Sequence, residues 1–154
     1  MLHTFKTKQL IKSNIHSLWN FISSPSNLTV ITPGEMQFEV INNENMEEIY
    51  PGQIIEYYVK PLAGIRVHWV TEITHVSEDK YFCDEQRMGP YRLWHHEHFL
   101  KNVDGGVEMT DIVHYKAPFG FLGDMVNTLI IKKKLKSIFD YRYAKFEEIF
   151  NQPA

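Results

Sequence analysis

Four ionisable side chains with the chemistry of proton transfer fall at alternating positions of neighbouring segments. His96 and His98 are separated by one residue, and Asp84 and Asp111 lie in the segments before and after them. Imidazole changes charge near neutral pH, and a nearby carboxylate favours its protonated form. Brought together, these residues could therefore act as general acids and bases on a bound carbonyl compound, with Tyr57 or Tyr115 polarising the carbonyl.

The same four side chains include the ligand types of a two-histidine, one-carboxylate metal site. His-x-His pairs are common on strands, however, and no acidic residue follows this pair at the distance typical of a cupin motif. The sequence also has no HExxH motif, no glycine-rich phosphate-binding loop and no nucleophile motif. We therefore expect no metal site and no cofactor.

The elements that position these residues are predicted from hydrophobic periodicity and turn-forming residues. A first strand is expected at 4–11, followed by a short helix capped by Ser13 and running through Ile22, and by a second helical turn from Ser24-Pro25 to about residue 34. Six more strands are expected at 36–42, 53–60, 66–76, 81–88, 91–101 and 107–116. Short connections between them favour antiparallel pairing.

After Pro118-Phe119-Gly120 the apolar period becomes that of a helix, expected at about 121–150. The order of elements predicts an α+β fold in which a curved, seven-stranded antiparallel sheet wraps around the long C-terminal helix. Residues 1–154 have the length of one domain. Asp140 and Arg142, near the end of the helix, could pair with polar groups of the cavity, but we expect ordinary salt bridges to the sheet instead.

Strand alternation decides which side chains face the interior. Apolar residues at 107, 109, 113 and 115 share a face with Asp111, and antiparallel pairing carries this parity to the preceding strands. His96 is then expected between Asp84 and Asp111, in a carboxylate–imidazole–carboxylate ladder. The alternative is a purely structural polar network, or a register that exposes the set. The residues expected to contact a ligand are Tyr57, Trp69, Gln86, Trp94, Met109, Tyr115 and, on the helix, Leu129.

The outward parity includes Cys83, which we expect to be inert, together with four histidines expected at the surface: His68, His75, His95 and His114. A net charge of −3 disfavours nucleic acid as a partner. No apolar run approaches the roughly 20 residues that span a bilayer, so we expect no membrane insertion. One cysteine excludes an internal disulfide, and the N-terminal residues lack the apolar stretch of a signal peptide. These features predict a cytoplasmic protein.

Three segments carry a family resemblance. The pattern Phe82-x-Asp84-x-Gln86-x-x-Gly89-Pro90-Tyr91-x-x-Trp94-x-His96-x-His98, followed by Met109-x-Asp111-x-Val113-x-Tyr115-x-x-Pro118-Phe119-Gly120, resembles bacterial members of the START-like helix-grip superfamily, often called SRPBCC. The later Ile138-Phe139-Asp140-Tyr141-Arg142 is similar to the end of the same subgroup. The resemblance implies a seven-stranded sheet, two small helices and a long helix over a ligand cavity. The superfamily includes lipid and hormone carriers, pollen-allergen-like proteins, and polyketide cyclases and dehydratases.

Three functions follow as hypotheses. The first is binding of a hydrophobic or amphipathic small organic molecule in a cavity between the sheet and the C-terminal helix. The second is a cyclase- or dehydratase-type lyase that uses a His/Asp acid–base pair, and the third is a ligand-responsive interaction module. We expect a monomer or a homodimer. A mostly apolar, closed cavity favours a carrier, whereas an open pocket with converging polar groups favours an enzyme.

Overall fold

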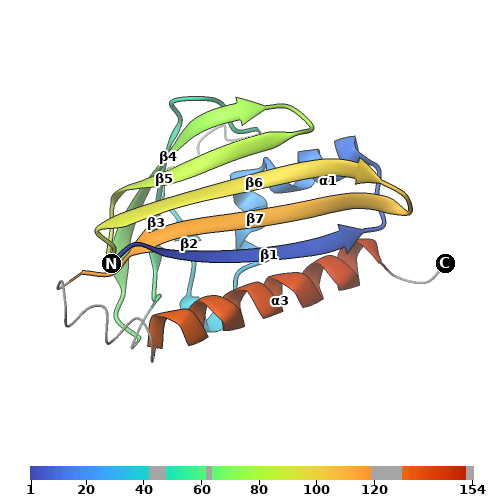
Figure 1. Cartoon of the computed structure of the whole chain (residues 1–154). Helices are drawn as coiled ribbons and strands as arrows, with labels where there is room; N and C mark the ends of the chain where they lie inside the picture. Colours follow the sequence, from blue (N-terminus) through green and yellow to red (C-terminus); the bar gives the residue numbers. More distant parts are fainter. Residues whose placement is uncertain (42–47, 62–63, 119–129, 152–154) are drawn as a thin grey trace.

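The computed structural model describes residues 1–41, 48–61, 64–118 and 130–151. Its first half contains β1 (His3–Ile11), α1 (Ile15–Ile22), the 3-10 helices η1 (Pro25–Thr29) and η2 (Gly34–Met36), β2 (Glu39–Val40) and β3 (Ile54–Val59). Its second half contains β4 (Val67–Ser77), β5 (Tyr81–Met88), β6 (Leu93–Val103), β7 (Gly106–Lys116) and α3 (Lys132–Phe150). Figure 1 labels these elements.

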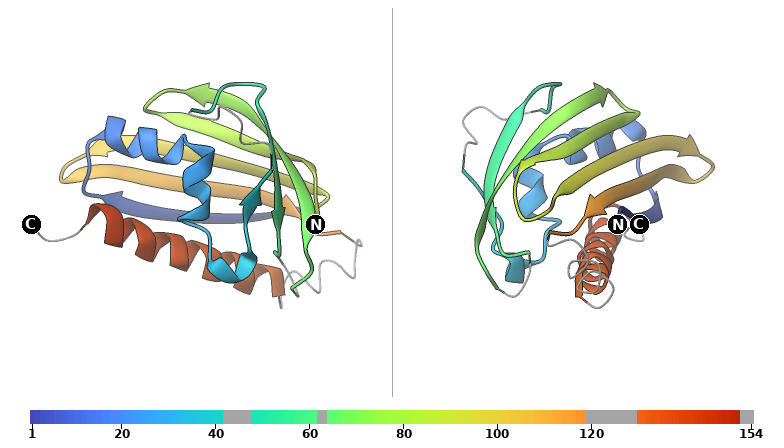
Figure 2. Two further views of the ribbon diagram at one scale, coloured as in Figure 1. Left: turned by 180° about the vertical axis from the view of Figure 1, so that it is seen from behind. Right: turned by 60° about the vertical axis from the view of Figure 1, so that its left-hand side comes forward.

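The strands form one seven-stranded antiparallel sheet in the order β1-β7-β6-β5-β4-β3-β2. The sheet is strongly curved, and α3 runs beneath β1 on its open side (Figure 2). Register shifts in the β4–β5 pair, at Val70/Thr71 and between Ile73 and His75, are irregularities of the kind that bend a sheet. This arrangement is the helix-grip α+β fold expected from the sequence.

The parity predicted for the last strand is confirmed. In β7, the five residues Val107, Met109, Asp111, Val113 and Tyr115 are all buried, whereas the side chains between them are partly exposed apart from that of Thr110. The register places His98 opposite Asp111 and His96 opposite Asp84. The two histidines therefore share the inward face with both carboxylates.

Helix α1 begins one residue later than its predicted cap implies. Asn14, rather than Ser13, is the N-cap, and its side-chain oxygen accepts a hydrogen bond from the backbone N–H of Ser17 at 2.8 Å. The hydroxyl of Ser13 donates instead to the carbonyl of Asn14 at 3.1 Å.

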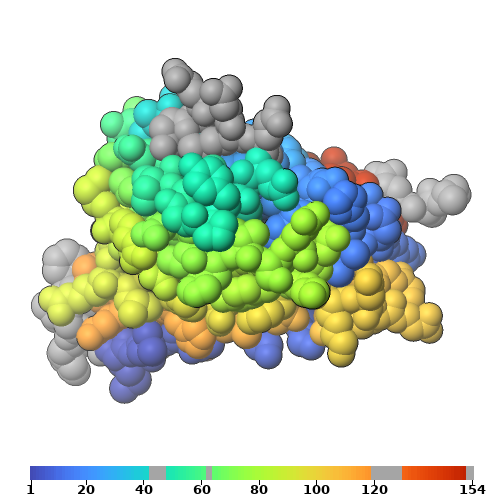
Figure 3. Space-filling model, turned by 90° about the horizontal axis from the view of Figure 1, so that it is seen from above, coloured from blue at the N-terminus to red at the C-terminus, as the bar shows by residue number. Residues whose placement is uncertain are grey.

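The turn between β4 and β5 lies against the N-terminal segment that contains α1 (Figure 3). There, His16 Nδ1 is 3.5 Å from Asp79 Oδ1.

In two predicted strands, an observed end lies more than one residue from the predicted end. The strand predicted at 36–42 contains only Glu39–Val40, because Met36 ends a 3-10 helix and Gln37 adopts a left-handed φ of 45°; residue 42 lies outside the described residues. The strand predicted at 91–101 begins at Leu93 and continues to Val103. The predicted helix start, 121–129, also lies outside the described residues.

Two apolar clusters join the sheet to the helices. One contains Trp19 of α1 and Phe146 of α3, and the other contains Trp69 of β4 and Phe139 of α3. At the β6–β7 turn, Gly106 has a φ of +148°, and a Cβ there would lie 2.2 Å from the carbonyl oxygen of Ile11. The contact between the β7 start and the β1 end thus requires glycine. In the described part of the chain, no helix combines the length and apolarity needed to cross a membrane.

Candidate functional site

A cavity of about 160 Å³ lies between the concave face of the sheet and α3. Most of its wall is apolar or aromatic, with contributions from the α1–η2 segment, from β3, β4, β5, β6 and β7, and from α3. Representative wall residues are Ile31, Met36, Val59, Trp69, Tyr91, Met109, Leu135 and Phe139. The cavity therefore provides an apolar environment with aromatic rings on several sides.

The polar part of the wall is the cluster predicted from strand parity. Asp84, His96, His98 and Asp111 all line the cavity. His98 Nε2 lies 2.9 Å from Asp84 Oδ2, and its Nδ1 lies 2.9 Å from Asp111 Oδ1. His96 Nε2 lies 3.1 Å from Asp111 Oδ1, and its Nδ1 lies 3.5 Å from Asp84 Oδ2. Each imidazole thus spans the two carboxylates, so the ladder contains both histidines rather than His96 alone.

The surroundings shift the pKa values of the two histidines in opposite directions. Burial lowers the pKa of His98, but hydrogen bonds to Asp111 and Asp84 outweigh it and raise the pKa above its ordinary value. Burial and the charge of His98 lower the pKa of His96, against the opposing effect of the carboxylates. The cluster therefore raises the pKa of His98 and lowers that of His96, so His98 retains its proton to a higher pH than His96 does.

Both carboxyl groups remain ionised. Burial raises the pKa of Asp111, but hydrogen bonds from His96 and His98 lower it well below the usual range. Asp84 shows the same balance, with the charge of His96 and the hydrogen bond from His98 opposing burial. Asp111 is only 1% exposed. Its charge is therefore held by the two imidazoles, since a buried carboxylate without partners is very unfavourable.

The residues predicted to contact a ligand divide into three groups. Tyr57, Trp69, Trp94 and Met109 line the cavity. Tyr57 also accepts or donates a hydrogen bond with Thr71 Oγ1 at 3.0 Å, and burial raises the pKa of its phenol far above the ordinary value. Its hydroxyl therefore stays neutral. Leu129 lies outside the described residues.

Two of the predicted ligand contacts are not part of the cavity wall. Gln86 faces the β5–β6 turn, where its Nε2 donates to the Tyr91 carbonyl at 2.6 Å and its Oε1 accepts from the Tyr91 backbone N–H at 3.2 Å. Tyr115 is 2% exposed and packs among aromatic rings, with the centroid of Trp94 at 6.5 Å and that of Tyr91 at 6.2 Å. Parity gave the correct face for both residues, but the cavity occupies only part of that face.

Arg142 of α3 is a cavity residue that the sequence interpretation placed elsewhere. Its guanidinium lies over the ring of Phe139, 4.9 Å from the centroid, and it forms no salt bridge to the sheet among the described residues. Asp140 instead pairs with Lys136 on the exposed side of α3 at 2.6 Å. The expected helix-to-sheet salt bridges are therefore wrong. The only sequence signal for Arg142 was its place within the apolar stripe of the helix.

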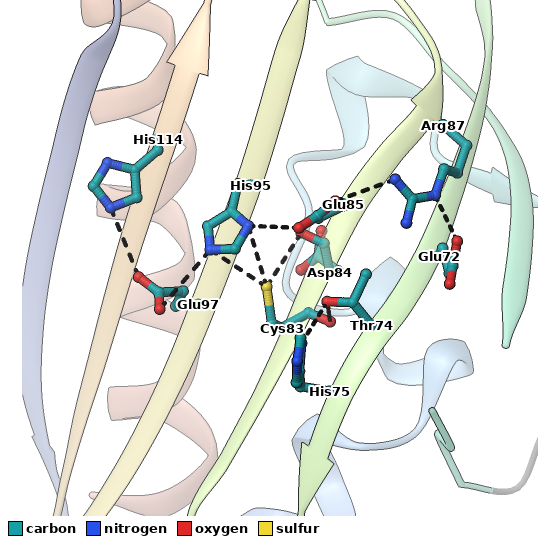
Figure 4. A network of polar contacts seen from close by, with 10 residues as sticks. All are labelled: Glu72, Thr74, His75, Cys83, Asp84, Glu85, Arg87, His95, Glu97 and His114. Atoms are coloured by element: carbon teal, nitrogen blue, oxygen red, sulfur yellow. Dashed lines mark hydrogen bonds and ion pairs between the residues drawn. The ribbon is translucent and has the colours of Figure 1, made fainter. Parts of the chain in front are cut away.

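The outer face of β5 and β6 carries a second polar network, shown in Figure 4. His95 Nδ1 lies 2.8 Å from Glu85 Oε1, and His95 Nε2 lies 3.8 Å from Glu97. Cys83 is fully buried beneath this network, and burial raises its pKa to about 11. The thiol is therefore protonated near neutral pH, which makes it a poor nucleophile.

Three groups of side chains in the described residues have metal-ligand types close together: one joins His16 of α1 to Glu78 and Asp79 of the β4–β5 turn, and the other two lie on the faces of the sheet. On the inner face, one ligand atom each from Asp84, His96 and His98 lies within 4.8 Å of the others; on the outer face, Cys83, Glu85 and His95 do the same. The inner atoms already satisfy one another through hydrogen bonds, and the outer thiol is protonated by burial. The geometry of each of these two sheet groups is thus explained by its own polar contacts.

No family model and no curated protein matches the chain. Its fold is nevertheless shared with solved structures. Protein CV1439 from Chromobacterium violaceum superposes with a TM-score of 0.72 at 8% identity, covering 97% of this chain and 99% of that one. Protein Ms6760 from Mycobacterium smegmatis gives 0.64 at 17% identity, covering 92% and 88%. Ara h 8.0201 gives 0.62 at 15% identity, covering 96% and 99%. These similarities support the helix-grip fold alone.

Proposed function

We propose that the protein binds a hydrophobic or amphipathic small organic molecule in the cavity between its sheet and α3. The observation that carries this proposal is a mainly apolar cavity with one polar cluster on its wall. Such a site buries the apolar body of a ligand and orients its polar end. The helix-grip fold shared with other proteins is consistent with this function, although fold alone does not identify a ligand.

The walls of the cavity favour a ligand with a flat or aromatic body. Trp69 lies with its ring centroid 5.9 Å from Tyr57 and 5.3 Å from Trp94, and Phe139 approaches from the opposite wall. Aromatic rings offset or edge-on to a flat ligand add stabilisation beyond burial of apolar area. The tryptophans also provide a signal, because their fluorescence responds to a molecule that enters the cavity.

Binding of the neutral dye 1-aminoanthracene tests the proposal. We expect its fluorescence to rise on binding to the parent protein, and Ile138→Trp to abolish the rise, because Ile138 lines the cavity and the larger side chain fills it. Ile149→Trp is the matched control, since Ile149 is an exposed residue of the same helix. Equal binding by all three proteins would place the dye elsewhere and contradict the proposal.

A second candidate is acid–base catalysis of a cyclase or dehydratase type. The observation that favours it is the position of two imidazoles on the cavity wall, each held between two carboxylates. His96, whose pKa is lowered, is the candidate base, and His98, whose pKa is raised, is the candidate acid. A β-hydroxy thioester or a poly-β-ketone probe would distinguish the candidates. Turnover that is lost in His96→Gln while probe binding survives would support catalysis, whereas binding without turnover leaves the carrier function.

A further inference from the structure

Three buried side-chain nitrogen or oxygen atoms of the described residues have no hydrogen-bond partner, and two of them belong to the cavity wall. These two are Trp69 Nε1 and Arg142 Nε. Both are N–H donors that cannot act as acceptors. The third atom, Asp79 Oδ1, lies away from the cavity, 3.5 Å from His16 Nδ1. Among the described residues, the cavity wall thus has two buried donors without a partner and no buried acceptor without one.

Buried donors are almost always paired in native structures, so an unpaired donor in a binding cavity indicates an acceptor on the ligand. Trp69 stands on β4 and Arg142 on α3, so the two donors come from the sheet wall and the helix wall. The indole ring of Trp69 is fixed by Tyr57, Tyr91 and Trp94, and the guanidinium by Phe139. Both donors are therefore held in place before a ligand arrives.

The charges within the cavity indicate what kind of acceptor fits. Asp84 and Asp111 accept hydrogen bonds from the two histidines, and no carboxylate of the described residues forms an ion pair with Arg142. The guanidinium contributes to the lowered pKa of Asp84, which indicates that it is close enough to act through its charge. A second cation, Lys134, reaches the wall from the same helix and pairs with Glu35. Arg142 is thus a cation with an unused donor.

We propose that Arg142 binds a carboxylate group of the ligand, with the indole N–H of Trp69 donating to an oxygen of the same molecule. The inference rests on the proposed binding function and names its ligand class: an amphipathic organic acid whose apolar body lies among the aromatic side chains. Guanidinium recognises carboxylates through paired, charge-assisted hydrogen bonds, which makes arginine better suited than lysine to this role. A neutral molecule of the same shape forms the aromatic contacts but leaves the charge unpaired.

The test compares three probes of matched shape: 2-naphthoate, 2-naphthamide and methyl 2-naphthoate, each titrated against the parent protein by calorimetry. We expect 2-naphthoate to bind about tenfold more tightly than either neutral probe, the effect of one charge-assisted contact. Arg142→Met should remove this preference while the neutral probes keep their affinity. Arg142→Lys should retain part of the preference, because it keeps the positive charge but loses the paired, planar N–H donors of the guanidinium.

Two controls separate this role from a structural one. Lys145→Met removes a cation from the same helix, one that pairs with Glu148 at 2.7 Å, and should leave the preference unchanged. Trp69→Phe keeps an aromatic ring without the N–H and should weaken the acid and both neutral probes by a similar few-fold factor, whereas Trp94→Phe should do so less. Cooperative urea unfolding with the slope of the parent would show that each variant is folded.

The outcomes distinguish carboxylate recognition by Arg142 from the proposed binding of small molecules in the cavity. Equal affinity of the parent for all three probes would overturn the carboxylate assignment and leave the binding function standing. A preference that survives Arg142→Met would also overturn it, because a group other than the guanidinium would then recognise the carboxylate. Failure of every probe, including 1-aminoanthracene, to bind the parent would overturn the proposed function and the inference together.

Discussion

His96 and His98 lie with their ring centroids 3.8 Å apart, and each imidazole presents one nitrogen to Asp84 and the other to Asp111. The two histidines are separated by one residue on the same face of β6, so the strand itself sets their spacing. The neighbouring strands supply one carboxylate each. Three buried ionisable groups and the partly buried Asp84 are thereby satisfied on the wall of an otherwise apolar cavity.

Replacing Asp111 by asparagine should change the titration of both histidines. Loss of the carboxylate charge removes a group that favours protonation, so the pKa of His98 should fall, and that of His96 should fall with it. The remaining charges facing the pair are Asp84 from β5 and Arg142 from α3. NMR titration of the histidine side chains measures the change, with His114 of the outer face as the internal reference. Titration curves that match those of the parent would contradict the ladder.

The stability of the protein should fall in acid because of the same carboxylate. Hydrogen bonds lower the pKa of Asp111 in the folded state, so its contribution is present above about pH 4, the unfolded value, and is lost as the pH falls further. Asp111→Asn should therefore show a weaker loss of unfolding free energy between about pH 5 and 3, because Asp84 is then the only carboxylate of the cluster that titrates. At neutral pH the variant should be less stable by roughly 3–5 kcal/mol. Urea midpoints across this range measure both effects, and parallel curves for parent and variant would exclude the assignment.

Truncating the two cavity tryptophans should have unequal effects on stability. Trp69 is 6% exposed, and Trp69→Ala should lower the free energy of unfolding by roughly 3–5 kcal/mol. Trp94 is only half-buried, so Trp94→Ala should cost less. Urea unfolding with an unchanged slope is the appropriate measurement. If both variants are as stable as the parent, these rings do not belong to the core.

Gln86→Ala should affect the fold and leave binding unchanged. Its side chain forms two hydrogen bonds with the Tyr91 backbone across the β5–β6 turn, so its loss should lower the unfolding free energy by about 1 kcal/mol per bond. Dye affinity should remain that of the parent, whereas Met109→Ala, which alters the cavity wall, should change it. Weaker dye binding by a folded Gln86→Ala protein would show that Gln86 reaches the ligand.

Alternation along strands was enough to predict the seven-stranded sheet and the inward position of Asp84, His96, His98 and Asp111. The pattern is informative here because β7 is buried on one face along its whole length, which fixes the register of its neighbours. It could not show that both histidines contact both carboxylates, because this depends on side-chain rotamers. It also could not separate residues of the cavity wall from residues of the solid core, and Tyr115, predicted to contact a ligand, is not part of the cavity wall for that reason.

Arg142 shows a different limit of the sequence. A charged residue within an apolar helical stripe is usually satisfied by a partner on the neighbouring element, and the sequence contains acidic residues on the facing strands. Those carboxylates are instead bonded to histidines, and within the described residues the Nε atom of Arg142 has no hydrogen-bond partner. Choosing between these pairings requires distances between α3 and the sheet. Similarly, Gln37 ends η2 in a left-handed conformation that a strand pattern does not reveal.

Intermolecular NOEs between bound 1-aminoanthracene and the protein test whether the cavity is the binding site, because they locate the ligand as well as detect its binding. We predict NOEs from the dye to the indole of Trp69, the ring of Phe139 and the methyl group of Met109, which line the cavity from three elements. Ile138→Trp should remove all three sets of NOEs, and Ile149→Trp should preserve them. NOEs confined to exposed side chains, with none to these three residues, would contradict the proposal that the cavity is the binding site.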